Sequence, residues 1–231
     1  IVLMQRSGFG AFGKMPSVGD FFRLGVTQEF VQPWDAWIQH SMLAASEALG
    51  ASWDAHYMSA PIWRFCLAPG LAGPQKMLGV LMPSVDRVGR RFPLTLVAGV
   101  SNEGSAALAH FRAAEVYRQL EDLALAALED DMTRDKLAEG LAALPAPTQQ
   151  PTAPVRAHGN TMVLTRGEVS DSLLPDLAAG LMSQRYRTPS VWSTEIGGVP
   201  RMMICEGLPD GANMQGLFNL HAALWTEARP I

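Results

Sequence analysis

Apolar residues in the first part of the chain form one long helical repeat. Its positions are Phe30, Trp34, Trp37, Ile38, Met42, Ala45 and Leu49. Spacings of three and four residues predict an amphipathic helix that buries one face. Pro33 suits a first helical turn, so we expect the helix to begin near Gln32. Trp34 and Trp37 are expected to anchor the core, together with Trp53 and Trp63.

Three short apolar segments follow this helix, and Pro or Gly bounds each of them. Residues 62–67, 77–82 and 92–100 have the length and composition of β-strands. The third segment directly follows the second, which predicts a hairpin. Because a hairpin joins antiparallel strands, a sheet that also contains strands separated by helices is expected to be mixed.

The second half of the chain adds further helices and a strand pair. Its strongest helical repeat lies in residues 106–130, and a second helix is expected from Thr133, a suitable N-cap, to Leu144. Strands interleaved with helices predict the α/β class, with helices on both faces of the sheet. The remaining expected elements are a strand at 161–164, a helix at 172–186, a strand pair at 191–196 and 201–205 that turns at 197–198, and a short helix at 214–224.

A proline-rich stretch interrupts these patterns. Four prolines fall within residues 145–154, which excludes a helix and favours an extended surface connection. The ~75 residues that follow would form only a marginal domain alone. We therefore expect residues 1–231 to form one domain that is crossed by a Pro-rich surface loop at about 145–157.

Composition limits the kind of protein that this chain can be. Of its 231 residues, 48% are hydrophobic and 17% are charged, which excludes a mainly disordered chain. The formal net charge of -4 argues against nucleic-acid binding, and the apolar stretches are too short for a membrane span. Cys66 and Cys205 form no Cys-x-x-Cys motif. Buried thiols in a reducing cytoplasm are favoured over a single disulfide bridge.

A glycine-rich segment near the N-terminus is one candidate for chemistry. Residues 8–14, GFGAFGK, match G-x-G-x-x-G and all but the last residue of the P-loop pattern. A nucleotide- or phosphate-binding loop at Gly8–Lys14 is therefore one alternative. Met15 replaces the Ser or Thr that would hold Mg²⁺, and Pro16 interrupts the helix that should follow. These departures favour structural glycines.

Two polar loops between apolar segments hold further candidates. Residues 17–20, shortly after Lys14, and residues 82–91 carry side chains of the kind that bind partners. The same residues are typical of turns, where Asp and Ser bond to nearby backbone amides and Asp pairs with Arg. Both interpretations stay open on the sequence alone. The candidate partner-binding residues are Lys14, Ser17, Asp20, Asp86, Arg87 and Arg90.

Local catalytic patterns are missing from the sequence. It contains no G-x-S-x-G, H-E-x-x-H or EF-hand motif, and its five histidines are scattered. A hydrolase that uses Asp20, Asp86 or Glu206 with a histidine is the weakest alternative, because no spacing brings these groups together. We therefore expect a protein that is not an enzyme and that has no catalytic residues, metal or cofactor.

Several segments together carry a resemblance to a known family. Residues 10–21, GAFGKMPSVGDF, are similar to the G-x-F-G-K-x-P-x-x-G-D-F opening of the TagF (ImpM) family of bacterial type VI secretion system-associated proteins. Three further segments, WDAW at 34–37, PIWRF at 61–65 and GVLMPSVDRVGR at 79–90, continue the likeness in order. A strand around Trp192, followed by two glycine-containing turns, resembles the family's C-terminal part.

The resemblance implies both a fold and a role. The fold is a layered α/β/α sandwich, and the role is that of a cytoplasmic accessory protein. Such a protein would regulate type VI secretion negatively and post-translationally, through protein–protein interaction with the forkhead-associated-domain scaffold protein of the same system. The family has no established catalytic residues, so none is carried over to this chain.

Overall fold

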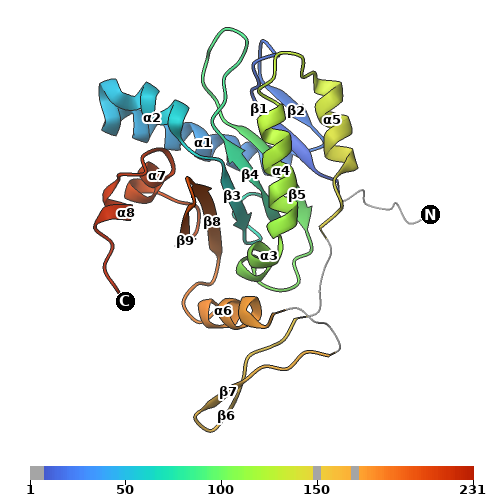
Figure 1. Cartoon of the computed structure of the whole chain (residues 1–231), viewed down its shortest axis with the longest axis vertical. Coiled ribbons are helices and arrows are strands. Elements are labelled where there is room, and N and C mark those ends of the chain that lie inside the picture. The colour runs from blue at the N-terminus through green and yellow to red at the C-terminus, as the bar shows by residue number, and fades with distance from the viewer. Residues whose placement is uncertain (1–7, 148–151, 168–171) are drawn as a thin grey trace, which may run out of the picture.

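A seven-stranded sheet forms the centre of the molecule, for which a computed structural model describes residues 8–147, 152–167 and 172–231 (Figure 1). The strands lie in the order β2-β1-β5-β4-β3-β8-β9, and β6 pairs with β7 in a separate hairpin. The bounds are β1 (Gly10–Gly13), β2 (Phe22–Leu24), β3 (Trp63–Leu67), β4 (Lys76–Met82), β5 (Leu94–Val100), β6 (Arg156–His158), β7 (Thr161–Val163), β8 (Pro189–Ile196) and β9 (Val199–Glu206).

Helices lie in three of the connections, between β2 and β3, between β5 and β6 and between β7 and β8, and two more follow β9. A 3-10 turn, η1 (Gly50–Ser52), joins the first two of them. The helices are α1 (Gln28–Leu49), α2 (Trp53–Ser59), α3 (Ala106–Arg112), α4 (Ala114–Ala126), α5 (Arg134–Ala143), α6 (Leu174–Met182), α7 (Gly211–Phe218) and α8 (Ala223–Thr226). No helix in the described parts of the chain has the length and hydropathy of a membrane span.

Alternating side chains along the strands build two cores. On β3, Trp63, Phe65 and Leu67 join a core beneath α1 and α7, whereas Cys66 joins a second core beneath α4 and α5. This alternation is the two-residue period of a strand that is buried on both faces. Figure 1 shows α4 lying across the front of the sheet with α1 behind it. The expected α/β class, with helices on both faces, is confirmed.

The direction of the strands differs from the expected mixed sheet. Every pairing between named strands is antiparallel, including the non-consecutive pairs β1–β5 and β3–β8. The helices made a mixed sheet plausible because crossover connections often join parallel strands. Here β3, β4 and β5 form a meander with short connections, and β8 and β9 form a hairpin. Each strand therefore runs opposite to its neighbour.

The helix boundaries differ from the sequence prediction in two places. Helix α1 begins at Gln28, one turn before the expected Gln32, because the Thr27 carbonyl accepts a hydrogen bond from the Val31 N–H and closes an earlier turn. Pro33 therefore lies inside the helix, where it removes one backbone donor. The predicted helix at 106–130 is two helices, because the Ala113 N–H bonds to the His110 carbonyl in a tighter three-residue turn.

The region after α5 is only partly as expected. Helix α5 has the predicted N-cap, since the Thr133 side chain accepts from the Lys136 N–H. The predicted strand at 161–164 corresponds to β7, which pairs with β6 in an exposed hairpin that projects from the sheet (Figure 1). The expected loop at about 145–157 ends in β6, and its residues 148–151 lie outside the described residues. The expectation of a single domain stays a prediction.

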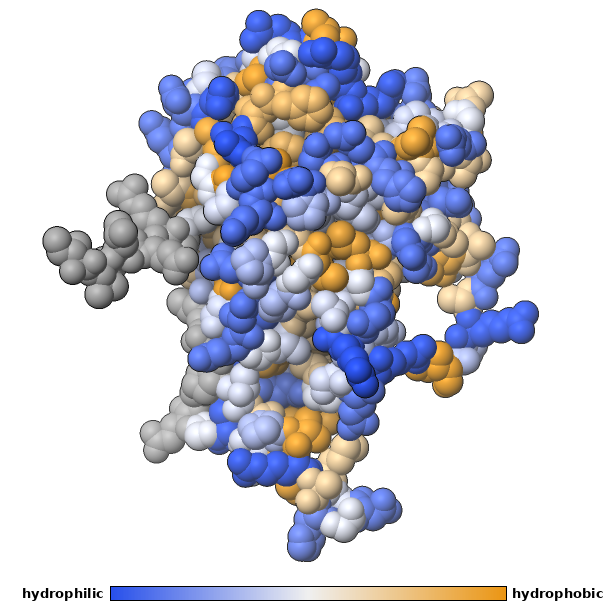
Figure 2. All heavy atoms as spheres, turned by 180° about the vertical axis from the view of Figure 1, so that it is seen from behind, coloured by the Kyte–Doolittle hydropathy of each residue, from blue (hydrophilic) through white to orange (hydrophobic). Residues whose placement is uncertain are grey.

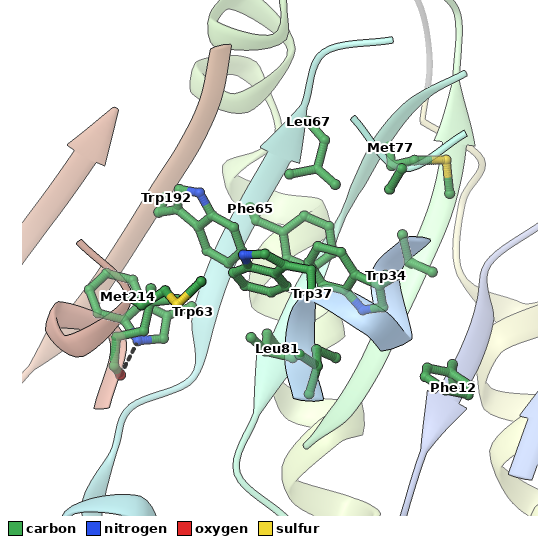
Figure 3. Close-up of a cluster of buried hydrophobic side chains, with 14 of the residues drawn as sticks. Phe12, Trp34, Trp37, Trp63, Phe65, Leu67, Met77, Leu81, Trp192 and Met214 are labelled. Atoms are coloured by element: carbon green, nitrogen blue, oxygen red, sulfur yellow. Dashed lines mark hydrogen bonds between the residues drawn. The ribbon is translucent and has the colours of Figure 1, made fainter. Parts of the chain in front are cut away.

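An aromatic stack fills the core beneath α1. Trp34, Trp37, Phe65 and Trp192 lie against one another, with the ring centres of Trp34 and Phe65 4.9 Å apart (Figure 3). The Trp34 indole N–H donates to Thr95 Oγ1 at 2.9 Å, and the Trp37 indole N–H donates to the Pro209 carbonyl at 2.9 Å. Buried indoles thus keep a partner for their polar atom. The expected core role of Trp34, Trp37 and Trp63 is confirmed, and Trp53 packs at the edge of this core.

Both thiols are free and buried, as expected. Cys66 lies in the core beneath α4, and Cys205 lies in the core beneath α1. Burial raises the pKa of Cys66 to about 12 and that of Cys205 to about 11. A thiol with such a pKa stays protonated and is a poor nucleophile near neutral pH.

A buried histidine links α3, α4 and β8. His110 Nδ1 lies 2.9 Å from Tyr117 Oη, and His110 Nε2 lies 2.8 Å from Ser193 Oγ. The Tyr117 hydroxyl donates to the Phe65 carbonyl, so Nδ1 must carry a proton and donate to Oη, while Nε2 accepts from Ser193. Burial, together with the charge of Arg64, lowers the pKa of His110 from 6.5 to about 3.

The lowered pKa of His110 predicts that acid destabilises the fold. Below pH 6.5 the unfolded chain binds a proton at this position, whereas the folded chain does not until about pH 3, so stability is lost as the pH falls through this window. We expect the contribution of His110 to the free energy of unfolding to fall by about 2 kcal/mol between pH 7 and pH 5. Urea denaturation of the wild type and of His110→Gln at both pH values measures it. An equal fall in both proteins would contradict the prediction.

Candidate binding site

The glycine-rich segment forms a strand rather than a phosphate-binding loop. Residues 10–13 are β1, which lies between β2 and β5 in the sheet. A Cβ atom at Gly10 would overlap the Leu24 carbonyl oxygen, and one at Gly13 would overlap the Pro93 carbonyl oxygen. These glycines therefore allow close approach of neighbouring backbones. The phosphate-binding loop expected under the alternative of nucleotide binding by Gly8–Lys14 is not formed, because residues 10–13 are extended and pair with β2 and β5.

An ion pair beneath the surface follows β1. Lys14 Nζ lies 3.0 Å from Asp86 Oδ2, and the exposed fractions of the two side chains are 6% and 0%. The same carboxylate accepts hydrogen bonds from Arg90 Nε at 2.7 Å and from the backbone N–H groups of Val88 and Arg90 at 3.1 and 2.9 Å. Two loops that are far apart in the sequence are thus tied together by one carboxylate.

The surroundings of Asp86 keep it ionised. Burial alone would raise its pKa, but hydrogen bonds from the Arg90 backbone, Lys14, the Arg90 side chain and the Val88 backbone outweigh burial and hold the pKa well below its usual range. Four donors occupy the carboxylate oxygens. A carboxylate in this state does not serve as a general acid or base near neutral pH. Asp86 and Lys14 position the loops.

Further hydrogen bonds join the two loops at the surface. The Arg87 N–H bonds to the Val18 carbonyl at 3.1 Å, and the Arg87 guanidinium donates to the Ser17 carbonyl at 2.8 Å. The Arg90 guanidinium donates to the Gly19 carbonyl at 2.8 Å. These contacts fix the two loops side by side, so the side chains on them are presented in a defined arrangement.

The joined loops form one exposed surface, here called the motif-loop surface. Val88 is 70% exposed and Phe21 is 47% exposed, although both are apolar. The Phe21 ring is held by Phe92, with ring centres 4.7 Å apart, and Lys14 Nζ lies 4.6 Å from the centre of the Phe21 ring. The residues of the motif-loop surface are Ser17, Asp20, Phe21, Arg87, Val88 and Arg90.

The structure separates the six candidate residues into two groups. Lys14 and Asp86 are buried and paired, so they lie beneath the motif-loop surface. Asp20, Arg87 and Arg90 are exposed, and Ser17 is half-buried. Phe21 and Val88 were missed by the sequence reasoning, and their signal was an apolar residue inside a polar loop.

No group of metal-ligating side chains accompanies this surface in the part of the chain that the structure describes. Within residues 8–147, 152–167 and 172–231, no three His, Cys, Asp or Glu side chains are placed to hold a metal ion. Among the described residues, the two larger hollows lie elsewhere, one beside the start of α1 and another between α3, α6 and the start of β8, and none of the six candidate residues lines them. The expectation of a protein without enzymatic activity stays a prediction.

The sequence of this fold and its loop motifs is that of a type VI secretion system-associated domain. Residues 10–144 match the family model of the TagF N-terminal domain, described as type VI secretion system-associated, and the chain belongs to this family. The match contains all six candidate residues.

A solved structure extends the similarity to the whole chain. The chain is similar to the crystal structure of PA0076 from Pseudomonas aeruginosa PAO1, with 30% sequence identity and a TM-score of 0.73. The alignment covers 96% of this chain and 97% of PA0076. A search among curated proteins gave no match. The part of the chain after residue 144 therefore belongs to the shared fold, as the likeness around Trp192 implied.

Proposed function

We propose that this chain is a cytoplasmic accessory protein, not an enzyme, that represses type VI secretion post-translationally by binding the forkhead-associated-domain scaffold protein of the same system. The observation that supports it best is membership of the type VI secretion system-associated TagF family, whose motif residues here shape an exposed surface. Lys14 and Asp86 are used entirely in joining two loops. What they present to solvent is the motif-loop surface.

The chemistry of the motif-loop surface suits protein binding. Phe21 and Val88 provide exposed apolar area, and Arg87 and Arg90 flank it with guanidinium groups. Aromatic residues and Arg are enriched at the centres of protein–protein interfaces, where they contribute most of the binding energy. The loops are already tied together by hydrogen bonds, so little conformational entropy is lost when a partner binds.

In repression by binding, this protein and the secretion machine compete for the same scaffold protein. A scaffold molecule that is held by this protein is removed from the pool that can build the secretion machine. The size of the effect depends on the protein's concentration relative to its dissociation constant, and no chemical step is needed. Affinity purification from the native cytosol, with secretion measured after deletion of the gene, tests this function. Failure to recover the scaffold, with unchanged secretion, would overturn it.

Charge reversal on the motif-loop surface is expected to weaken scaffold binding while the fold survives. Arg87→Glu replaces an exposed guanidinium with a carboxylate, and we expect the dissociation constant to rise about tenfold or more. Arg185→Glu, at an exposed position after α6, is the matched control and should bind normally. Isothermal titration calorimetry measures binding, and circular dichroism checks the fold. Equal binding by wild type and Arg87→Glu would place the interface elsewhere.

A further inference from the structure

The two edges of the central sheet differ in how they are protected. At one edge, β2 has only three residues. At the other edge, β9 has eight residues and, within the described parts of the chain, pairs only with β8 (Figure 1). Natural proteins protect an edge by making it short, charged or covered, because its unpaired N–H and C=O groups otherwise recruit another strand. On the outward side of β9, such protection is confined to Pro200 and Glu206 near the two ends of the strand, and the residues between them are apolar at Met202 and Ile204.

The hairpin geometry shows which backbone groups of β9 point outward. Gly197 and Gly198, with φ of 57° and 75°, close a two-residue turn, so Ile196 and Val199 form the first hydrogen-bonded pair. Alternate residues of β9 then bond to β8, starting with Val199 and Arg201. Pro200, which has no N–H, falls on the outward set, as a proline in an edge strand must. The outward residues are Pro200, Met202, Ile204 and Glu206.

Backbone groups on the outward side of β9 have no partner in the described chain. No backbone hydrogen bond from residues 8–147, 152–167 or 172–231 reaches Met202 or Ile204 from that side. The Met202 side chain is 47% exposed, and the side chain of Ile204 is half-buried against a small cluster below α3 and α6. The edge therefore offers both hydrogen bonds and apolar contact, which an extended strand satisfies together.

We infer that β9 pairs with β9 of a second copy of this chain, in an antiparallel arrangement about a two-fold axis at Met203. In this register Met202 lies opposite Ile204 of the second copy, and the two residues exchange both of their outward backbone hydrogen bonds. The two-fold axis generates a second, identical pair. The Glu206 N–H of one copy donates to the Pro200 carbonyl of the other copy. Because proline has no N–H, one hydrogen bond is missing at each end of the paired strands.

The strand is complementary to itself in this register. The apolar side chains of Met202 and Ile204 meet across the axis on one face, which stabilises a cross-strand pair. Arg201 lies opposite Cys205, and Pro200 lies opposite Glu206, so no like charges face each other. An isologous contact of this kind closes after two copies and does not propagate. The two seven-stranded sheets become one continuous sheet.

The face of the molecule seen in Figure 2 has no broad apolar surface that could join two copies instead of β9. Figure 2 shows hydrophobic residues on that face as small patches separated by hydrophilic ones. A strand that is added to a sheet edge does not need a broad apolar face, because backbone hydrogen bonds supply part of the binding energy.

The mass of the full chain in solution tests the pairing. Light scattering coupled to size-exclusion chromatography should give twice the 25.0 kDa monomer mass at high concentration, with the mass falling on dilution. Met202→Lys places a charge opposite Ile204 and should raise the dimer dissociation constant about tenfold or more. Val199→Lys, also at an exposed apolar position of β9 but far from the axis, should dimerise normally.

Hydrogen exchange tests the register independently of any variant. The N–H groups of Arg201 and Met203 bond to β8 and should exchange slowly at all concentrations, whereas those of Met202 and Ile204 should become protected only as the dimer forms. A protein that stays monomeric with these two amides unprotected overturns the inference. A dimer that survives Met202→Lys, or that leaves the amides of Met202 and Ile204 unprotected, also overturns it, because another surface would then join the copies.

Discussion

Trp34→Ala is expected to lower the free energy of unfolding by about 3–5 kcal/mol. The Trp34 side chain is 0% exposed and lies at the centre of the aromatic stack, with its ring centre 4.7 Å from that of Trp37 and 4.9 Å from that of Phe65. Removal of the indole creates a large cavity that neighbouring rings, already fixed by their own contacts, can fill only in part. It also takes the hydrogen-bond donor from Thr95 Oγ1.

Chemical denaturation, followed by circular dichroism, measures this loss for Trp34→Ala. Leu43→Ala is the matched control, because Leu43 lies on the same helix with 57% of its surface exposed, and its truncation should change stability by less than about 0.5 kcal/mol. Thr95→Val separates the hydrogen bond from the packing, since valine keeps the shape and removes the hydroxyl. A loss below about 1 kcal/mol in Trp34→Ala would show that the stack is not central to the fold.

The helical repeat and the apolar strands were predictable because each of them buries a face. The helical spacing of Phe30, Trp34 and Trp37 located α1, and the three apolar runs located β3, β4 and β5 within two residues at either end. Burial on both faces makes such strands continuously apolar, which the sequence displays directly. The Gly197-Gly198 turn likewise located the β8–β9 hairpin, because paired glycines allow the positive φ angles that the turn requires.

Other elements leave too little signal in the sequence. Strand β2 has three residues, of which only Phe22 is buried, and α2 contributes only Tyr57 as a fully buried side chain. The break between α3 and α4 lies at Ala113, whose N–H bonds to the His110 carbonyl, and it leaves the helical spacing of the apolar residues in the sequence unchanged. Strand order depends on contacts between segments that are far apart, such as β3 with β8, and local patterns do not encode these contacts.

The motif-loop surface was predictable as a pair of loops but not as a surface. Polar residues between strands marked both loops, and Lys14 and Asp86 were two of the candidate partner-binding residues on them. Lys14 and Asp86 are 72 positions apart in the sequence, and they form an ion pair because the sheet brings the end of β1 beside the loop after β4. Lys14 and Asp86 are paired below, and Asp20, Phe21, Arg87, Val88 and Arg90 are the side chains of the motif-loop surface that stay exposed to solvent.

Asp86→Asn is expected to lower the midpoint of thermal unfolding by on the order of 10 °C. The amide keeps the shape of the carboxylate but not its charge, so the Lys14 ammonium remains buried opposite a neutral group. The Arg90 guanidinium also loses its ionic partner. Asp20→Asn is the matched control, because Asp20 is an exposed aspartate in the same pair of loops and, among the described residues, accepts a hydrogen bond only from the neighbouring Phe21 N–H. Its midpoint should stay within a degree or two of the wild type.

The pH dependence of this difference separates the ion pair from a general loss of packing. The pKa of Asp86 is lowered from 3.8 in the folded chain, so its contribution to stability is present above 3.8 and is lost as the pH falls toward the lower folded value. The gap between wild type and Asp86→Asn should therefore be constant from pH 7 to pH 5 and should narrow in more acidic solution. Differential scanning calorimetry across this pH range measures the gap.

Lys14→Met and the double variant complete a double-mutant cycle with Asp86→Asn. The stability losses of the two single variants should add to clearly more than the loss of the double variant, because each substitution breaks the same ion pair. A gap that persists unchanged in acid, or losses that add, would show that the loops are held by packing rather than by the carboxylate.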